Sequence, residues 1–325
     1  MRTRELGPQG LEVTECGLGC WQLGGGWGNP WDDGIAQEIL TAAYNSRVRF
    51  FDTADGYGGG DSERSLGRFR QTHPDIMIAT KLGRVGMYPD GYTREAMLAA
   101  TQGSLERLGV DRLDLTQLHC VPVEVLREGQ VFDWLREQRN QGLIARFGAS
   151  VETVEQGLIC LDQEGITSLQ IIFNIFRQKP LQELLPRARE KGVGIITRLP
   201  LASGLLTGKF GKETQFKAGD HRNFNRDGQR FYVGETFAGI PFETGVELAD
   251  ELKEMHPQGM STVQMALRWI LDQDAVSVVI PGASSPQQAV ANAGISDLPP
   301  LSDELHAQLE EFYRGRVHDH IRGPY

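Results

Sequence analysis

The sequence predicts a closed (β/α)8 TIM barrel, and three features of its 325 residues favour this fold class. Short apolar segments alternate with longer helical patterns, as in strand–helix units joined by right-handed crossovers. Most of the short segments are continuously apolar, which indicates parallel strands covered on both faces. No G-x-G-x-x-G motif follows any of them, so a doubly wound open sheet is the weaker alternative. The eight expected strands cover residues 16–21, 48–53, 76–80, 113–118, 145–150, 169–174, 192–197 and 275–280.

Helix boundaries can be read between several of these strands. Residues 32–46 begin with two acidic residues, and residues 93–109 begin with a capping threonine and end at a glycine. Residues 124–142 and 180–192 also end at a glycine, which favours a helix C-terminus, and the second of them begins with a proline. Each of these helices follows a predicted strand, as the barrel repeat requires.

Two segments lie outside the repeat. Residues 1–15 are expected to form a β-hairpin that turns at residues 7–10, Gly-Pro-Gln-Gly. Residues 208–242 are long, polar and aromatic and lack a helical period, so we expect a functional or mobile loop there. This loop falls between the seventh and eighth strands and should lie over the mouth of the barrel. With these two additions, residues 1–325 are expected to form one barrel domain.

Charge and composition argue against several classes of function. The net charge of −10 and the pI near 5.3 argue against nucleic acid as a partner, because phosphate binding needs a basic face. We find no signal peptide and no apolar segment of the roughly 20 residues that span a bilayer, so a cytoplasmic protein with no membrane partner is expected. None of the four cysteines forms a Cys-x-x-Cys pair, which favours reduced, packed cysteines. His318 and His320 are expected to be solvated, and no metal is predicted.

Four titratable side chains stand at or just after three successive strand ends. Asp52 ends the second strand and Tyr57 follows in its loop, while Lys81 and His119 end the third and fourth. Active sites of such barrels form at this end of the strands. Alone, each residue has a structural explanation: a buried ion pair, a packed tyrosine or a core histidine. Together at one barrel mouth they favour a functional site.

These residue types suit proton delivery to an oxygen atom. A free phenol has a pKa near 10, and a lysine ammonium beside Tyr57 stabilises the phenolate and eases loss of the proton. Asp52 would keep Lys81 charged and oriented, and His119 could hold a carbonyl oxygen against the phenol. The site is therefore expected to protonate an oxygen while something else attacks the adjoining carbon.

The order of these residues, in "FFDTADGYG", "IATKLG" and "LTQLHC", resembles the catalytic tetrad of the aldo-keto reductase superfamily. The resemblance extends to "LGPQGLEVTECGLGCWQLGG", "PLASGLLTGKF" and "IPGASSPQQAVANAG", and so covers nearly the whole chain. The last motif is similar to a branch that holds bacterial oxidoreductases and potassium-channel β subunits. The resemblance implies hydride transfer between NADP(H) and a carbonyl or alcohol. It makes Tyr57 the proton donor, Lys81 and Asp52 the groups that tune it, and His119 the group that orients the substrate oxygen.

The resemblance also implies where the cofactor binds. Ser150 and Gln170 match positions that hold the nicotinamide carboxamide, with Asn174 as a possible helper, and Arg198 stands where an aromatic ring usually stacks on the nicotinamide. Residues 200–209 match the segment around the pyrophosphate. The full set of implied cofactor contacts is Cys20, Trp21, Asp52, Ser150, Gln170, Arg198, Leu199, Leu201, Ser203, Leu205, Lys209, Arg222, Gly282, Ser284, Gln288 and Asn292.

The adenosine end departs from the family pattern. Residues 282–292 have a Ser-Pro start typical of a helix N-terminus, which favours a phosphate. Ser284 and Ala291 stand where arginine and glutamate are frequent, and Arg222 could supply the missing charge. NADP(H) is favoured over NAD(H).

The expected substrate is a small aldehyde or ketone, and the aromatic residues Trp21, Trp27, Trp31, Tyr88 and Phe224 could line its pocket. Two rival functions stay open. One is a cofactor-binding regulatory subunit with little turnover, as the β-subunit resemblance suggests. The other is a lyase that uses Lys81 as a Schiff base, which Tyr57 and Asp52 fit poorly. Nothing in the sequence favours one oligomeric state.

Overall fold

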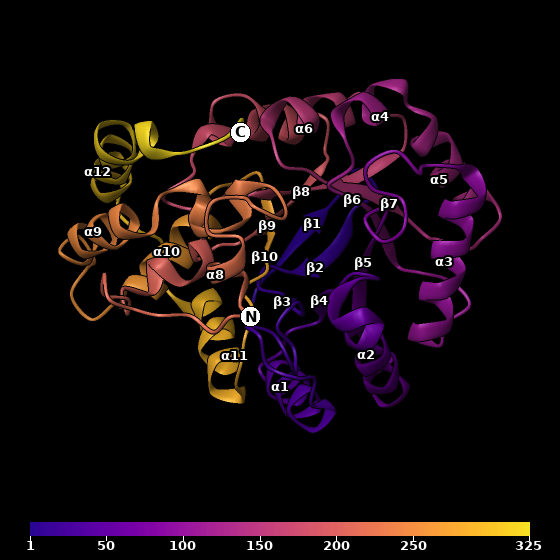
Figure 1. Ribbon diagram of the computed structural model, residues 1–325, viewed down its shortest axis with the longest axis horizontal. Coiled ribbons are helices and arrows are strands. Elements are labelled where there is room, and N and C mark those ends of the chain that lie inside the picture. Colours follow the sequence, from indigo (N-terminus) through magenta and orange to yellow (C-terminus); the bar gives the residue numbers. More distant parts are fainter.

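Eight parallel strands form the centre of the computed structural model, which describes residues 1–325. Neighbours in the sheet follow chain order from β3 to β10, and the sheet closes through parallel bridges from Cys16 to Val279 and from Gly19 to Gly282. The helices surround the strands, and α1 and α11 lie side by side (Figure 1). The predicted barrel is confirmed. Its strands are β3 (Leu18–Gly19), β4 (Phe50–Asp52), β5 (Met77–Leu82), β6 (Leu115–His119), β7 (Phe147–Ser150), β8 (Ile166–Ile172), β9 (Gly194–Arg198) and β10 (Val276–Val279).

Several helices begin and end where the capping residues indicate. The Thr93 side chain accepts a hydrogen bond from the backbone N–H of Ala96, and Gly109 ends the same helix with φ 63°. The segment 124–142, expected as one helix, is two, because Gly129 adopts φ 80° between them. The segment 180–192, also expected as one helix, instead begins with a 3₁₀ turn at Lys179–Leu181, and its α-helix starts at Leu184. The helices are α1 (Asp33–Asn45), α2 (Asp61–Thr72), α3 (Arg94–Leu108), α4 (Val123–Glu128), α5 (Gln130–Asn140), α6 (Val154–Leu161), α7 (Leu184–Glu190), α8 (His221–Phe224), α9 (Phe242–Lys253), α10 (Thr262–Leu271), α11 (Pro286–Ala293) and α12 (Asp303–Phe312).

The N-terminal hairpin plugs the end of the barrel opposite the strand carboxyl ends. Strands β1 (Thr3–Leu6) and β2 (Leu11–Thr14) pair in antiparallel register, and the turn between them uses Gly7 and Gly10 at φ 85° and 66°. Leu6 is fully buried in a small core of its own. The other members of this core are Val13, Phe50, Ala79, Leu115, Ile196, Val278 and Ile280. The hairpin therefore fills this end of the barrel interior.

We expect Leu6→Ala to destabilise the fold by about 2–4 kcal/mol, because it leaves a cavity where the hairpin meets the barrel interior. Urea unfolding followed by circular dichroism measures the change. Glu12→Ala, at an exposed position of the same hairpin, serves as the control and is expected to change stability by less than about 0.5 kcal/mol. Equal midpoints for Leu6→Ala and the wild type would show that the plug does not stabilise the barrel.

The segment 208–242 lies over the barrel mouth, as predicted, and is packed by its own aromatic residues. It contains the short helix α8 and two 3₁₀ turns, Val233–Glu235 and Phe237–Gly239. Phe216 and Phe237 pack with their ring centroids 5.8 Å apart. The C-terminal tail holds the segment from outside, since Arg322 pairs with Asp227 at 2.6 Å. Aromatic packing rather than helical periodicity therefore orders these residues.

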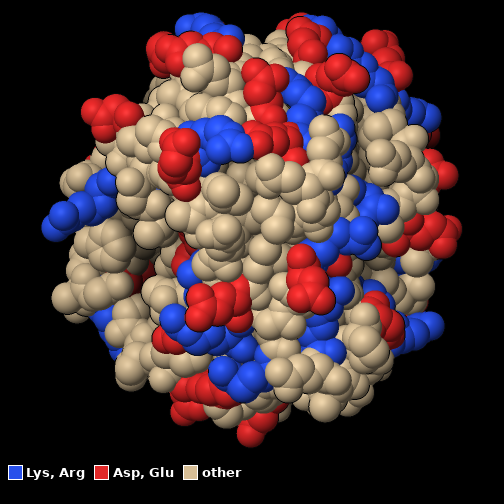
Figure 2. Space-filling model, turned by 90° about the vertical axis from the view of Figure 1, so that its right-hand side faces the viewer, with Lys and Arg blue, Asp and Glu red and all other residues tan.

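No helix in the structure combines the length and apolar character that crossing a membrane requires. On the face beside α3 and α5, acidic and basic side chains are interspersed rather than segregated (Figure 2). All four cysteines are free and buried, in agreement with the sequence-based expectation.

Candidate active site

Lys81 joins Asp52 and Tyr57 at the carboxyl ends of β4 and β5. Its Nζ atom donates to Asp52 Oδ1 at 2.6 Å, to the Thr53 carbonyl at 2.7 Å and to the Tyr57 hydroxyl oxygen at 3.1 Å. The amine and the carboxylate are both buried. Because the ammonium donates to the phenol oxygen, the phenol O–H can donate to another acceptor.

Two amides complete the surroundings of Asp52. Gln170 Nε2 donates to Asp52 Oδ2 at 2.7 Å, and Gln117 Nε2 lies 3.4 Å from the same oxygen. Ser150 Oγ lies 3.4 Å from Gln170 Oε1, so the two predicted carboxamide contacts are adjacent. Gln117 was not predicted, although it lies in the motif "LTQLHC" two residues before His119, a spacing that puts both side chains on the same face of the strand. Both carboxylate oxygens of Asp52 are therefore engaged in hydrogen bonds.

Burial dominates the proton affinity of Tyr57. It raises the pKa of the phenol above its ordinary value near 10, although Lys81 lowers it in the opposite direction. Burial likewise lowers the pKa of Lys81, but Asp52 and Tyr57 raise it by more, so it ends above its ordinary value. The lysine effect expected from the sequence is present, but burial outweighs it. Tyr57 therefore keeps its proton at neutral pH, as a proton donor must.

His119, the last residue of β6, completes the predicted tetrad. Its ring meets that of Tyr57 edge to face, with centroids 5.9 Å apart. The buried Nδ1 atom has no hydrogen-bond partner. Burial, reinforced by the cations Lys81, Arg84 and Arg198, holds the pKa of His119 well below 6.5. The imidazole is therefore neutral and suited to binding an uncharged oxygen.

We expect the NMR signals of the His119 ring to stay unchanged from about pH 8 to pH 6, where an unperturbed histidine would titrate. Protonation there would place a charge beside three cations in a buried site. Stability that depends on neutral His119 is complete above about pH 6.5 and is lost as the pH falls toward the depressed folded-state pKa. His119→Gln assigns the signals, and a midpoint near 6.5 would contradict the expectation.

An ion-pair cluster that the sequence did not predict lies next to the tetrad. Glu235, from the segment 208–242, pairs with Arg198 Nη1 and with Arg84 Nη1, each at 3.3 Å. Arg198 Nη2 also contacts Cys120 Sγ at 3.5 Å. Burial raises the pKa of Glu235, but the two arginines lower it by more, so the carboxylate is charged. Glu235 had no sequence signal because it lies in a segment without periodicity.

The same cluster brings Cys120 and two carboxylates within the spacing of metal ligands. Ligand atoms of Cys120, Glu152 and Glu235 lie within 4.8 Å of one another. Burial, and then repulsion by Glu235, raises the pKa of Glu152 to about 7. Since Glu235 already pairs with two guanidinium groups, we interpret the cluster as ionic and structural.

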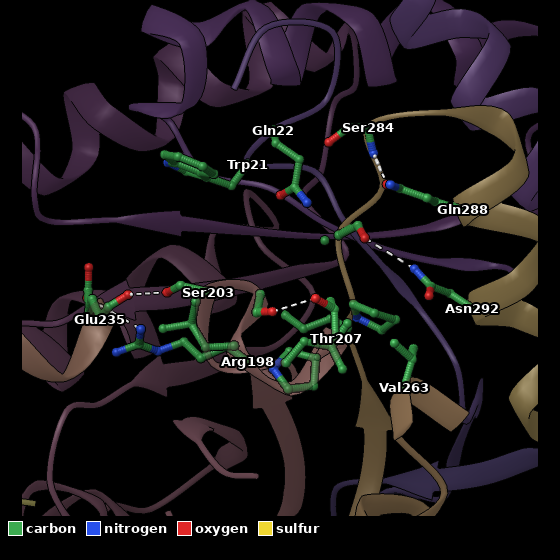
Figure 3. Close-up of a pocket in the computed structure, with 18 of the residues that line it drawn as sticks. Trp21, Gln22, Arg198, Ser203, Thr207, Glu235, Val263, Ser284, Gln288 and Asn292 are labelled. Atoms are coloured by element: carbon green, nitrogen blue, oxygen red, sulfur yellow. Dashed lines mark hydrogen bonds and ion pairs between the residues drawn. The ribbon is translucent and has the colours of Figure 1, made fainter. Parts of the chain in front are cut away.

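A cavity of about 1790 Å³ extends from the tetrad to the start of α11. Figure 3 shows it between Trp21, Gln22 and the α11 residues on one side and Arg198, Thr207 and Val263 on the other. Most of the predicted cofactor contacts line it. These are Trp21, Asp52, Ser150, Gln170, Arg198, Leu199, Leu201, Ser203, Lys209, Arg222, Gly282, Ser284, Gln288 and Asn292.

Backbone strain marks the segment predicted to surround the pyrophosphate. Leu199, Ala202 and Ser203 have φ of 52°, 49° and 55°, which is unfavourable for residues with a Cβ atom. The Ser203 hydroxyl donates to the Glu235 carbonyl at 3.2 Å and accepts from the Phe237 N–H at 3.2 Å. Such strain is retained where surrounding contacts hold it, and it is concentrated at ligand sites.

At the far end of the cavity, polar side chains around α11 are held in place. Ser285 caps the helix, and Gln288 Oε1 accepts from the Ser284 N–H at 2.8 Å. Asn292 Nδ2 donates to the Gly282 carbonyl at 3.1 Å (Figure 3). The predicted helix N-terminus is confirmed here.

Several predicted residues lie elsewhere or are already engaged. The Cys20 and Leu205 side chains are buried and do not line the cavity. Asn174 donates to the Leu199 carbonyl at 2.9 Å and is likewise outside the lining. Arg222 lines the cavity, but its charge is paired with Asp220 at 2.5 Å.

The aromatic side chains expected around the substrate divide into two groups. Trp21, Trp27 and Phe224 line the cavity, whereas Trp31 and Tyr88 do not. His221, which was not predicted, lies against Trp27 with ring centroids 5.1 Å apart. This wall faces the same cavity as the tetrad.

The cavity fits a nicotinamide dinucleotide by its chemistry. At one end, Arg198 Nε and His119 Nδ1 are buried without partners beside the amides and hydroxyl of the floor. At the other end, the helix N-terminus of α11 and exposed Lys209 favour negative charge. A long ligand with a polar ring at one end and phosphates beyond it matches this distribution.

Comparisons with known proteins agree with this geometry. The family model "Aldo/keto reductase family" matches residues 15–314. The chain is 30% identical over 326 residues to a probable voltage-gated potassium channel subunit beta of Oryza sativa subsp. japonica, covering 93% of each. It is 28% identical over 307 residues to Aldo-keto reductase YhdN of Bacillus subtilis (strain 168), covering 91% of this chain and 89% of the relative.

Two solved structures share the fold. One is aldo-keto reductase AKR11C1 from Bacillus halodurans in its holo form, with a TM-score of 0.77, 26% identity and 96% of each chain covered. The other is the glycerol dehydrogenase AKR11B4 from Gluconobacter oxydans, with a TM-score of 0.77, 26% identity and coverage of 99% of this chain and 98% of that one.

Proposed function

Because the chain belongs to the aldo/keto reductase family, and is thus an oxidoreductase that uses a nicotinamide cofactor on small carbonyl compounds, we propose that it is an NADP-dependent aldehyde or ketone reductase with Tyr57 as the proton donor. The single observation that carries this proposal is the position of Lys81 Nζ, 3.1 Å from the Tyr57 hydroxyl and 2.6 Å from Asp52.

The side chains divide the proton chemistry among them. A bound nicotinamide cofactor supplies the hydride to the carbonyl carbon. The Tyr57 O–H donates to the carbonyl oxygen and gives up its proton as negative charge develops there. Lys81 stabilises the phenolate that remains, and Asp52 keeps the amine charged and in place. The neutral His119 ring holds the same oxygen through its N–H, which fixes the carbonyl against the phenol.

For the cofactor, we propose a preference for NADP(H) over NAD(H). The extra phosphate would lie near the start of α11, where Ser284 and Gln288 are exposed, with Lys209 as an exposed cation on the facing segment. Arg222 is less suited to this role, since Asp220 already pairs with it.

Binding titrations test this preference, with quenching of Trp21 and Trp27 as the signal, because both line the cavity. We expect a lower Kd for NADPH than for NADH, and a smaller difference in Lys209→Met. Lys212→Met, which changes an exposed lysine paired with Glu247, is the matched control. Equal or tighter binding of NADH by the wild type would contradict the preference.

A second candidate function is a cofactor-binding regulatory subunit, which the likeness to potassium channel β subunits favours. Turnover separates the two functions. Steady oxidation of NADPH at 340 nm with a panel of small aldehydes and ketones supports the reductase. Tight NADPH binding without oxidation by any carbonyl in the panel supports the regulatory subunit.

A further inference from the structure

Arg198 lines the part of the cavity that the reacting ring of a bound cofactor would occupy. The carbonyl oxygen is held at Tyr57 and His119, and hydride transfer requires the donor carbon about 3–3.5 Å from the carbonyl carbon. Arg198 lines the same cavity floor as Ser150 and Gln170. Its guanidinium also contacts Cys120, the residue after His119. Wherever the ring lies against this floor, the guanidinium is among its nearest charged groups.

The charge balance on this floor depends on Glu235. Lys81 is neutralised by Asp52 at 2.6 Å. The cations Arg198 and Arg84 share the single carboxylate of Glu235. The other nearby carboxylate, Glu152, has no ion pair and a pKa raised to about 7 by burial and by Glu235 itself, so it is only partly charged at neutral pH. Without the charge of Glu235, the two arginines would lose their ion-pair partner. Glu152, no longer repelled by Glu235, would ionise more fully, but it is already partly charged and forms no ion pair with either arginine, so it would replace only part of the lost charge.

The ring itself changes charge in the reaction. A nicotinamide ring is neutral when reduced and carries one positive charge when oxidised, so uncompensated arginines would repel the oxidised form and leave the reduced form nearly unaffected. We infer that Glu235 is a positioning residue that holds Arg198 and offsets the two arginines, and so sets the relative affinity of the protein for oxidised and reduced cofactor. This inference rests on the proposed function and extends it to the balance between reaction directions.

The location of Glu235 gives the segment 208–242 an electrostatic role. The backbone carbonyl of Glu235 accepts a hydrogen bond from Ser203 Oγ at 3.2 Å. The strained segment of residues 199–204 therefore holds the loop that carries the Glu235 carboxylate. Figure 3 shows this contact and the pair with Arg198 together. Order in the loop and charge at the reacting end of the cavity are therefore linked.

The test is the ratio of Kd for NADP+ to Kd for NADPH, measured by titration of the full-length protein. In Glu235→Gln we expect this ratio to rise several-fold, up to the order of tenfold that a full unit charge about 10 Å away gives at an effective dielectric constant near 20. A tenfold rise makes the midpoint potential of the bound two-electron couple about 30 mV more positive. Glu235→Asp keeps the charge and is expected to keep the ratio near that of the wild type.

Arg84→Met gives the opposite prediction from the same account. It removes one of the two cations that Glu235 offsets, so the ratio of Kd for NADP+ to Kd for NADPH is expected to fall. This variant also keeps the inference testable if Glu235→Gln does not fold. A purely structural role would weaken both cofactor forms equally in every variant. Unchanged ratios in Glu235→Gln and Arg84→Met, with both forms bound by the wild type, would overturn the inference and leave the proposed function intact. A wild-type protein that binds neither form would overturn both.

Discussion

Replacing Tyr57 with phenylalanine is expected to lower kcat by about 10²–10⁴-fold, the range that a positioned general acid contributes. The ring remains to fill its place beside His119, and only the proton and the hydroxyl oxygen are lost. Cofactor binding should be nearly unchanged, since Ser150 and Arg198 are untouched. NADPH oxidation at 340 nm gives the rate, and fluorescence titration gives the Kd.

Tyr88→Phe is the matched control for this experiment. Tyr88 is 56% exposed, lies outside the cavity and loses the same hydroxyl group. Its kcat should match that of the wild type. A Tyr57→Phe enzyme as fast as this control would assign the proton to another donor.

Replacing Asp52 with asparagine is expected to destabilise the fold by about 3–5 kcal/mol, because Lys81 would remain as a buried charge without its carboxylate. Lys81 is 1% exposed and Asp52 2%, so solvent does little to compensate. The Gln170 amide would lose its charged acceptor as well. Urea unfolding at neutral pH measures the change, and kcat should fall along with stability because Lys81 is no longer oriented toward Tyr57.

Asp61→Asn is the control that removes an exposed ion pair instead of a buried one. Asp61 pairs with Arg64 at 2.9 Å, and both side chains are more than 40% exposed. Such a pair contributes less than about 1 kcal/mol. Equal losses from Asp52→Asn and Asp61→Asn would show that the buried pair has no special importance for the fold.

The barrel and the meeting of Asp52, Tyr57, Lys81 and His119 at its mouth could be predicted because they depend on local pattern and on topology. Continuous apolar segments indicated the strands, and in a parallel barrel all strands end at one mouth, which brings Asp52, Lys81 and His119 together. The Ser-Pro pair predicted where α11 begins, because proline is favoured in the first helical turn. The division of the segment 124–142 into two helices at Gly129 was not predicted. A glycine inside a helical pattern is compatible both with a continuous, less stable helix and with a helix end.

The remaining parts of the site depend on tertiary structure. Glu235 reaches Arg198 and Arg84 only because aromatic packing folds the segment 208–242 over the mouth, and no periodic pattern encodes that packing. The net pKa of Tyr57 could not be read from its neighbours, because burial, which outweighs Lys81, is a property of the folded chain. Other residues of the motifs that contain Cys20 and Leu205 line the cavity. The side chains of Cys20 and Leu205 themselves are buried in the core, which the motifs alone did not reveal.

The measurement that tests the central claim most directly is the transfer of a label from cofactor to product. NADPH that carries deuterium in place of both hydrogens of the reactive ring carbon is incubated with a small aldehyde and the wild-type protein, and the alcohol is analysed by mass spectrometry. Our account predicts one deuterium on the carbinol carbon, formed at a rate about 10²–10⁴-fold lower in Tyr57→Phe. Label that stays on protein-bound NADPH, with no labelled alcohol from any small carbonyl compound, would contradict it.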